Sequence, residues 1–189
     1  KMILRRMGNK TKIATEIQKY FPDHKTYLEP FFGAGGMFFN KSKAKYNIVN
    51  DADSDVFNLF QVISNKKDEF EKAFYSMPIH QDLLRFWREN KEKEDIKKAL
   101  RFLFLSNLTY LGAGQTLTIS GYNNSKQIMY DLINKTNEII FDVQFTNVDF
   151  RDFFRLISFD DRGNGGTQRA FIYCDPPYLG TNDNYSHSF

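Results

Sequence analysis

Short apolar runs that end at turn-forming residues occur near the start of the chain and again towards its end. They are rich in β-branched and aromatic residues and too short for helices, so each one predicts a buried strand. Prolines, glycines or aspartates stand at or just after their ends; proline ends a strand because it lacks the N–H that a sheet ladder needs. The predicted strands are residues 26–31, 46–50, 143–150 and 170–174.

Between these two groups of strands, the apolar residues have the spacing that is typical of helices. Apolar residues recur every three or four positions from Ser54 to about Thr109, as in Val56, Phe60 and Ile63, which predicts consecutive helices. The glycine-rich stretch that follows contains an alternating "TLTIS" and predicts a β-hairpin or an exposed loop. Further helices are predicted at about 10–20, 37–45, 126–140 and 150–157.

The order strand, glycine turn, helix, strand predicts an α/β fold with a parallel sheet. A chain of 189 residues has room for one such domain that carries an insert. We therefore interpret residues 1–53 and 141–189 as one α/β domain. Residues 54–140 form a mostly helical insert, with a hairpin near 110–122.

Composition narrows the class of protein. The chain is 41% hydrophobic and has 20 phenylalanines, which is enough for a packed core. No apolar run reaches the ~18 residues of a membrane span, so no membrane partner is predicted. The single cysteine, Cys174, cannot form an internal disulfide, which favours a cytoplasmic protein. The net charge of +3 is compatible with a nucleic-acid partner, and the three histidines lack metal-ligand spacing, so no metal is predicted.

Candidate binding groups follow the predicted strands, and the carboxyl ends of parallel strands share one edge of a sheet. Gly33, Gly35 and Gly36 form a turn where a ligand can approach the backbone, although many such turns bind nothing. The dinucleotide fingerprint needs a third glycine where this chain has Phe38, which favours a nucleoside without a pyrophosphate. Asp51 can accept both hydroxyls of a ribose; the alternative is a helix cap or a solvated turn acid.

The most specific signal is "DPPY" at residues 175–178. An amine attached to an aromatic ring is a poor nucleophile, because its lone pair is delocalised into the ring. Asp175 and the carbonyl of Pro176 can accept its two N–H groups, Pro177 stiffens the turn, and Tyr178 can stack on a base rotated out of a duplex. The alternative is an ordinary turn that ends a strand.

Asp149 and Phe150 complete this set of strand-end residues. Asp149 offers an acceptor for an exocyclic amine and Phe150 a face for a purine, although Phe150 taken alone is more typical of a core. The charged residues of 85–101 alternate in sign, which favours a solvated helix face over a phosphate-binding surface. Trp87 and Phe86 are interpreted as core residues of their helix rather than as a platform for a base.

Three motifs together resemble those of the Dam-like (alpha-group, D12 class) DNA adenine-N6 methyltransferases. "DPPY" matches their catalytic tetrapeptide, "EPFFGAGGMFFN" (29–40) their S-adenosylmethionine motif, and "MGNKTKIATEI" (7–17) the G-x-K motif that precedes it. The order of motifs around a helical recognition insert is also that of the family. The resemblance implies a Rossmann-like methyltransferase sheet, S-adenosylmethionine as cofactor, and methylation of a flipped adenine in double-stranded DNA.

The resemblance also implies roles for individual residues. Catalysis would fall to Asp175, Pro176, Pro177 and Tyr178, and DNA contact to Lys10, Tyr110, Gln115 and Thr116, with Tyr110 the best candidate. The cofactor residues would be Met7, Gly8, Lys10, Glu29, Pro30, Phe31, Phe32, Gly33, Ala34, Gly35, Gly36, Asp51, Asp149, Phe150 and Asp175.

The chain departs from the family at two places. GATC-reading members have an arginine in the hairpin where this chain has Gln115 and Thr116, so recognition of GATC is not predicted. The family also continues beyond the position of Phe189 with further strands, so we expect a sheet that is incomplete at its C-terminal side, and a downstream polypeptide is a candidate partner. Alternatives that stay open are a non-catalytic cofactor- or DNA-binding module, half of a split enzyme, and methylation of cytosine N4 or of RNA adenine.

Overall fold

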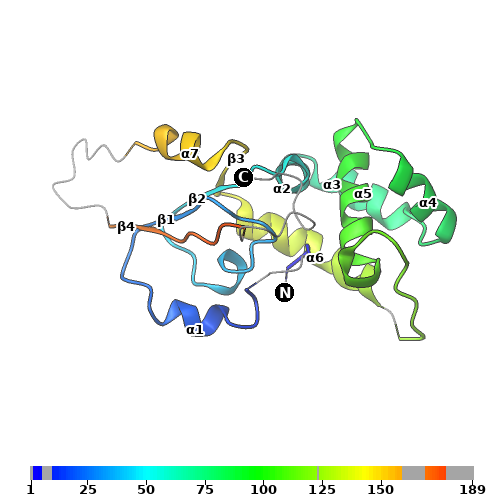
Figure 1. Ribbon diagram of the computed structural model, residues 1–189, viewed down its shortest axis with the longest axis horizontal. Helices are drawn as coiled ribbons and strands as arrows, with labels where there is room; N and C mark the ends of the chain where they lie inside the picture. Colours follow the sequence, from blue (N-terminus) through cyan, green and yellow to red (C-terminus); the bar gives the residue numbers. More distant parts are fainter. Residues whose placement is uncertain (1, 6–9, 123, 159–168, 178–189) are drawn as a thin grey trace. The chain divides into compact units, whose positions relative to one another are not determined.

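The computed structural model describes residues 2–5, 10–122, 124–158 and 169–177 (Figure 1). The chain forms two compact units. One contains Lys10–Phe57 and the described residues from Asp142 onwards; the other contains Asn58–Phe141 and the described residues 2–5. Within the described ranges, no helix is long and apolar enough to cross a membrane.

The first unit is built on a sheet of four parallel strands. In space their order is β3-β2-β1-β4, so β1 lies between β2 and β4. From β1 the chain moves outward to β2 and β3 and then returns to the other side of β1, which puts the topological switch point between β1 and β4. This parallel α/β sheet confirms the predicted fold class. The strands are β1 (Thr26–Glu29), β2 (Tyr46–Asn50), β3 (Gln144–Thr146) and β4 (Ala170–Ile172).

Aromatic side chains pack around β1 and β4. Tyr27 and Leu28 of β1 are fully buried, and the ring of Phe21 lies 4.4 Å from that of Phe171 in β4. Short helices accompany the sheet, and Figure 1 shows α1 and α7 on opposite sides of the strands in this view. They are α1 (Ala14–Gln18), η1 (Phe38–Asn40) and α7 (Phe150–Leu156).

Two of these elements are shorter than the sequence predicts. The helix expected at 37–45 is only the single turn η1, because side chains satisfy its terminal groups: Asn40 donates to the Gly36 carbonyl at 2.8 Å, and Gln18 donates to the Asn40 carbonyl at 2.9 Å. The strand expected at 143–150 ends at Thr146, because the side chain of Asn50 binds both the N–H and the carbonyl of Val148.

The second unit is helical, as the sequence predicts. Leu103 and Phe104 of its helix α5 are fully buried, and the Trp87 ring packs edge-on against Phe104 at 5.2 Å, which confirms that Trp87 is a core residue. The same prediction is wrong for Phe86, which is 52% exposed. Asn107 at the end of α5 holds the N-terminal segment by donating to the Ile3 carbonyl at 2.6 Å. The helices, the first of which begins in the sheet unit, are α2 (Ser54–Asn65), α3 (Lys67–Ser76), α4 (Gln81–Glu89), α5 (Asp95–Asn107) and α6 (Ser125–Ile140).

The predicted hairpin near 110–122 is a shorter structure. One antiparallel bridge joins Thr109 to Leu117, and the Tyr110 N–H donates to the Thr116 carbonyl at 2.7 Å. The chain between them turns through η2 (Tyr110–Gly112). Leu111 has a φ of 53°, a left-handed conformation that is uncommon for a side chain of this size.

Candidate functional site

Asp51 faces the glycine turn that follows β1. Its Oδ2 accepts the Gly33 N–H at 2.6 Å, and its Oδ1 accepts the Asp53 N–H at 2.8 Å. The helix α2 is capped by a different residue, since Asp53 accepts the Asp55 N–H at 2.9 Å. The structure therefore separates the two roles that the sequence left open: Asp53 caps the helix, and Asp51 belongs to the glycine turn.

The two glycines with positive φ in this turn serve different needs. A Cβ on Gly35 (φ +72°) would lie 2.6 Å from the Phe39 ring and 2.7 Å from the Phe32 ring, so Gly35 is required by packing. A Cβ on Gly33 (φ +56°) would meet nothing within 4 Å. The backbone at Gly33 therefore borders open space, where a ligand can approach it closely.

Asp149 and Phe150 follow β3 as predicted. Asp149 is the N-cap of α7: it accepts the Arg151 N–H at 2.9 Å and pairs with the Arg151 guanidinium at 2.7 Å. Hydrogen bonds from Arg151 lower the pKa of Asp149 to about 2. The Phe150 ring lies 5.3 Å from that of Phe31, so an aromatic residue after β3 meets one after β1.

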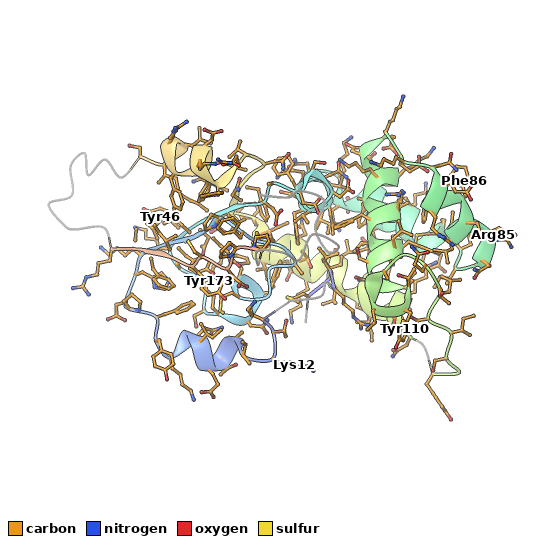
Figure 2. The ribbon with its side chains drawn as sticks, viewed as in Figure 1. Lys12, Tyr46, Arg85, Phe86, Tyr110 and Tyr173 are labelled. Carbon is orange, nitrogen blue, oxygen red and sulfur yellow. The ribbon has the colours of Figure 1, made fainter. Side chains whose placement is uncertain are left out.

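Asp175 follows β4 and pairs with a residue from the start of the unit. The Lys10 ammonium lies 2.7 Å from Asp175 Oδ2, and the two side chains are 20% and 26% exposed. The strand ladder continues one residue past β4, because the N–H of Tyr173, labelled in Figure 2, donates to the Leu28 carbonyl at 2.8 Å. The backbone just before Asp175 is thereby attached to β1.

Glu29, the last residue of β1, is a buried acid. Its side chain accepts the hydroxyl hydrogen of Tyr27 at 2.7 Å, and the residue is 2% exposed. Loss of solvent raises the pKa of Glu29 to about 8, although the Tyr27 hydrogen bond and the charge of Lys41 act in the opposite direction. Burial likewise lowers the pKa of Lys41, whose ammonium lies over the Tyr27 ring at 4.0 Å from its centroid, to about 8.

The contacts of Asn50 were not predicted from the sequence. This last residue of β2 is 1% exposed, and its side chain hydrogen-bonds to Pro30 after β1 and to Thr146 and Val148 at the end of β3. Asparagine at the end of a strand is an ordinary turn signal, and only the adjacency of the three strands reveals these partners.

In the helical unit, Tyr110 and Leu111 stand exposed on the loop after α5 (Figure 2). Their side chains are 66% and 64% exposed, which is unusual for two adjacent large apolar residues. The hydroxyl of Thr109 fastens the loop by accepting the Gly114 N–H at 2.8 Å and donating to the Leu105 carbonyl.

The structure thus brings several predicted residues together within the sheet unit: Gly33 with Asp51, Phe31 with Phe150, and Lys10 with Asp175. Met7, Gly8 and Tyr178 lie outside the described residues. In the part of the chain that is described, no three His, Cys, Asp or Glu residues are grouped to hold a metal ion. An acid beside an open glycine turn, with aromatic rings after the neighbouring strands, is an arrangement suited to binding a nucleoside.

A known protein family and several curated proteins are similar to this chain over most of its length. The family model of the D12 class N6 adenine-specific DNA methyltransferases matches residues 7–188. Similar proteins include the DNA adenine methylases of Escherichia coli strain K12, 25% identical over 177 residues, and of Serratia marcescens, 28% identical over 177 residues. The Retron Ec67 DNA adenine methylase of Escherichia coli is 28% identical over 199 residues.

These alignments cover most of this chain but only part of each relative. They include 90%, 90% and 97% of the chain and 62%, 64% and 65% of the respective relatives. The chain thus spans less than two thirds of the length of the curated relatives it matches.

Proposed function

Because the chain belongs to the D12 class of N6 adenine-specific DNA methyltransferases, we propose that its protein transfers a methyl group from S-adenosylmethionine to the N6 amine of adenine in double-stranded DNA. The observation that supports this most directly is the grouping of Asp51 with the glycine turn at the carboxyl end of a parallel sheet that has its switch point beside β1. Parallel sheets of this order bind nucleoside-type ligands at that place.

The residues at the strand ends fit the nucleoside half of the cofactor. Asp51 accepts the ribose hydroxyls, Phe150 offers a face to the adenine, and Asp149 accepts from its amine, while Phe31 packs against Phe150. Gly33 leaves room for the ligand against the backbone. When bound, S-adenosylmethionine supplies a methyl group on a positively charged sulfur, so no metal or covalent enzyme intermediate is needed.

Residues 175–177 bind the target base. The Asp175 carboxylate and the Pro176 carbonyl accept the N–H groups of the target amine, which leaves its lone pair free to react. Lys10, paired with Asp175 at 2.7 Å, holds this carboxylate in place. Tyr178 stacks on an adenine that has rotated out of the duplex.

We assign DNA recognition to the insert, residues 54–140, and catalysis to residues 1–53 and 141–189. Tyr110, with Gln115 and Thr116, contacts the DNA from the loop after α5. Within the described residues, β4 is one of the two edge strands of the sheet. We also propose that a downstream polypeptide pairs with β4 and completes the sheet. The proposed location of the protein is the cytoplasm.

Transfer of labelled methyl groups to DNA by the full-length protein tests the proposal. We expect incorporation by the wild type and a loss of at least a hundredfold for Asp175→Ala, with Asp142→Ala, which removes an exposed ion-pair residue before β3, as a control that retains activity. Digestion of the product to nucleosides should give N6-methyladenine. N4-methylcytosine would move the assignment to another acceptor, and cofactor binding with no transfer would indicate a non-catalytic module.

A further inference from the structure

Asn50 uses the whole hydrogen-bonding capacity of its side chain. Its Nδ2 donates to the carbonyls of Pro30 (3.1 Å) and Val148 (2.9 Å). Its Oδ1 accepts from the Thr146 hydroxyl (2.8 Å) and the Val148 N–H (3.1 Å). An amide side chain has two donor hydrogens and two acceptor lone pairs, so all four are engaged. Carbonyls only accept and a backbone N–H only donates, so this amide fits in a single orientation.

The partners of Asn50 lie in the two segments to which the nucleoside contacts are assigned. Pro30 begins the turn that contains Phe31 and Gly33, and Val148 directly precedes Asp149. The backbone of Asn50 adds a further bond, since its carbonyl accepts the Phe32 N–H at 2.9 Å.

The neighbouring residue strengthens the same connection. The Asp51 N–H donates to the Thr146 carbonyl at 3.2 Å, and the Asn147 side chain donates to the Asp51 carbonyl at 2.7 Å. The segment after β3 is therefore held to the end of β2 by side chains rather than by a continued strand ladder. The Asp51 side chain also reaches the turn after β1, at Gly33, whereas the Asn50 side chain bonds both to this turn and to the segment after β3.

We infer that Asn50 is a positioning residue for the cofactor: it sets the separation between the turn after β1 and the segment that carries Asp149 and Phe150. This inference rests on the proposed function, and it adds a residue that touches no ligand itself. Loss of the amide leaves backbone groups of both segments without a partner, so the segments shift relative to Asp51. A displacement of this kind weakens binding of the nucleoside more than it slows the chemical step.

The same strand offers a matched control. Asn47 is 2% exposed in β2, and its Nδ2 donates to the Ala44 carbonyl at 2.8 Å. Its partners, Ala44 and Lys41, lie before β2 and outside both nucleoside segments. Asn47→Ala therefore removes an equally buried asparagine from the same strand without touching the connection made by Asn50.

Calorimetric binding of S-adenosylhomocysteine and of 5′-methylthioadenosine to the full-length protein tests the inference. 5′-Methylthioadenosine lacks the amino-acid part of the cofactor, so an equal loss of affinity for both probes would place the effect at the nucleoside. We expect Asn50→Ala to weaken both about tenfold or more, and to raise the KM for the cofactor while kcat changes by less than about threefold. Asn47→Ala should bind both probes like the wild type.

A milder variant allows the inference to be tested even if Asn50→Ala does not fold. Thr146→Val removes one donor to Asn50 and keeps the shape of the side chain, so it should weaken both probes by a smaller factor in a folded protein. Unchanged affinity in a folded Asn50→Ala, or in Thr146→Val if Asn50→Ala does not fold, would overturn the positioning role. A wild type that binds neither probe would instead refute the proposed cofactor, and the inference with it.

Discussion

Gly33 and Gly35 stand two residues apart with the same sign of φ, yet they should respond differently to substitution. Gly35→Ala should lower the free energy of unfolding by about 2–4 kcal/mol, because left-handed strain adds to the contacts of 2.6 and 2.7 Å with Phe39 and Phe32. Gly33→Ala meets no atom and should cost only about 1 kcal/mol. Its new methyl group occupies the open space, so it should weaken S-adenosylhomocysteine binding. Urea denaturation and calorimetry measure both effects, and equal destabilisation would contradict the assignment.

Glu29 makes stability depend on pH. Its pKa of about 8 in the folded protein exceeds the value of 4.5 for the free side chain, so the folded state holds the proton more tightly. The stabilisation is complete below about pH 4.5 and is lost as the pH rises to about 8. Between pH 5 and 8 the wild type should therefore lose stability relative to Glu29→Gln, by an amount on the order of a few kcal/mol.

Urea denaturation of both proteins at several pH values measures this difference. Glutamine can still accept the Tyr27 hydroxyl hydrogen but does not titrate. Lys41, with a pKa of about 8, changes charge mainly above this range, so it should contribute little to the slope. Parallel stability curves for the two proteins would show that Glu29 titrates normally.

The sequence predicted which residues follow the strands, but it did not predict the contacts that residues make across the sheet. Asp51 is recognisable because an acid directly follows an apolar run. Asn50 is not, because its partners stand at positions 30 and 146–148 and become neighbours only when β1, β2 and β3 are adjacent. The pairing of Asp149 with Arg151 was also missed, although it is local in sequence.

At the scale of elements, the loop after α5 carries the DNA-binding proposal. Tyr110→Ala should weaken binding to duplex DNA about tenfold, since stacking of an aromatic side chain on a base contributes about 1–3 kcal/mol. Its stability should hardly change, because the Tyr110 side chain is 66% exposed. Tyr75→Ala on α3, where the tyrosine is 71% exposed, is the matched control. Fluorescence anisotropy with a labelled duplex measures the DNA affinity of both variants. Equal losses of affinity would contradict a specific role of the loop after α5 in DNA binding.

Element boundaries were predictable where packing repeats, and unpredictable where a single side chain ends the element. The helices α2 to α6 bury a regular apolar face, and the spacing of that face is visible in the sequence. β3 and η1 stop early because Asn50 and Gln18 supply hydrogen bonds from outside the element. Such partners come from other parts of the chain, so local patterns do not reveal them.

For the whole molecule, the two units should respond separately to the cofactor. A ligand held by residues of the sheet unit stabilises that unit by mass action, by about 2.7 kcal/mol at a concentration a hundred times its Kd. Hydrogen exchange should therefore slow in β1, β2 and β3 when S-adenosylhomocysteine is added, while α3, α4 and α5 change little. Duplex DNA is the complementary probe and should protect the loop after α5. Equal protection of both units by the nucleoside would contradict the assignment of its site to the sheet unit.

The discontinuity of the sheet unit also has a consequence for synthesis on the ribosome. β1 pairs with β2, only a short distance along the chain, but also with β4, which begins at Ala170. At ~5–20 residues per second, roughly 7 to 28 s pass between translation of β1 and translation of β4. Throughout that interval one side of β1 has no native neighbour, while the helices between Asn58 and Phe141 emerge as one uninterrupted stretch and can fold first. A nascent chain of this protein therefore carries an open strand edge for much of its synthesis, which makes it a natural client for chaperones that shield such edges.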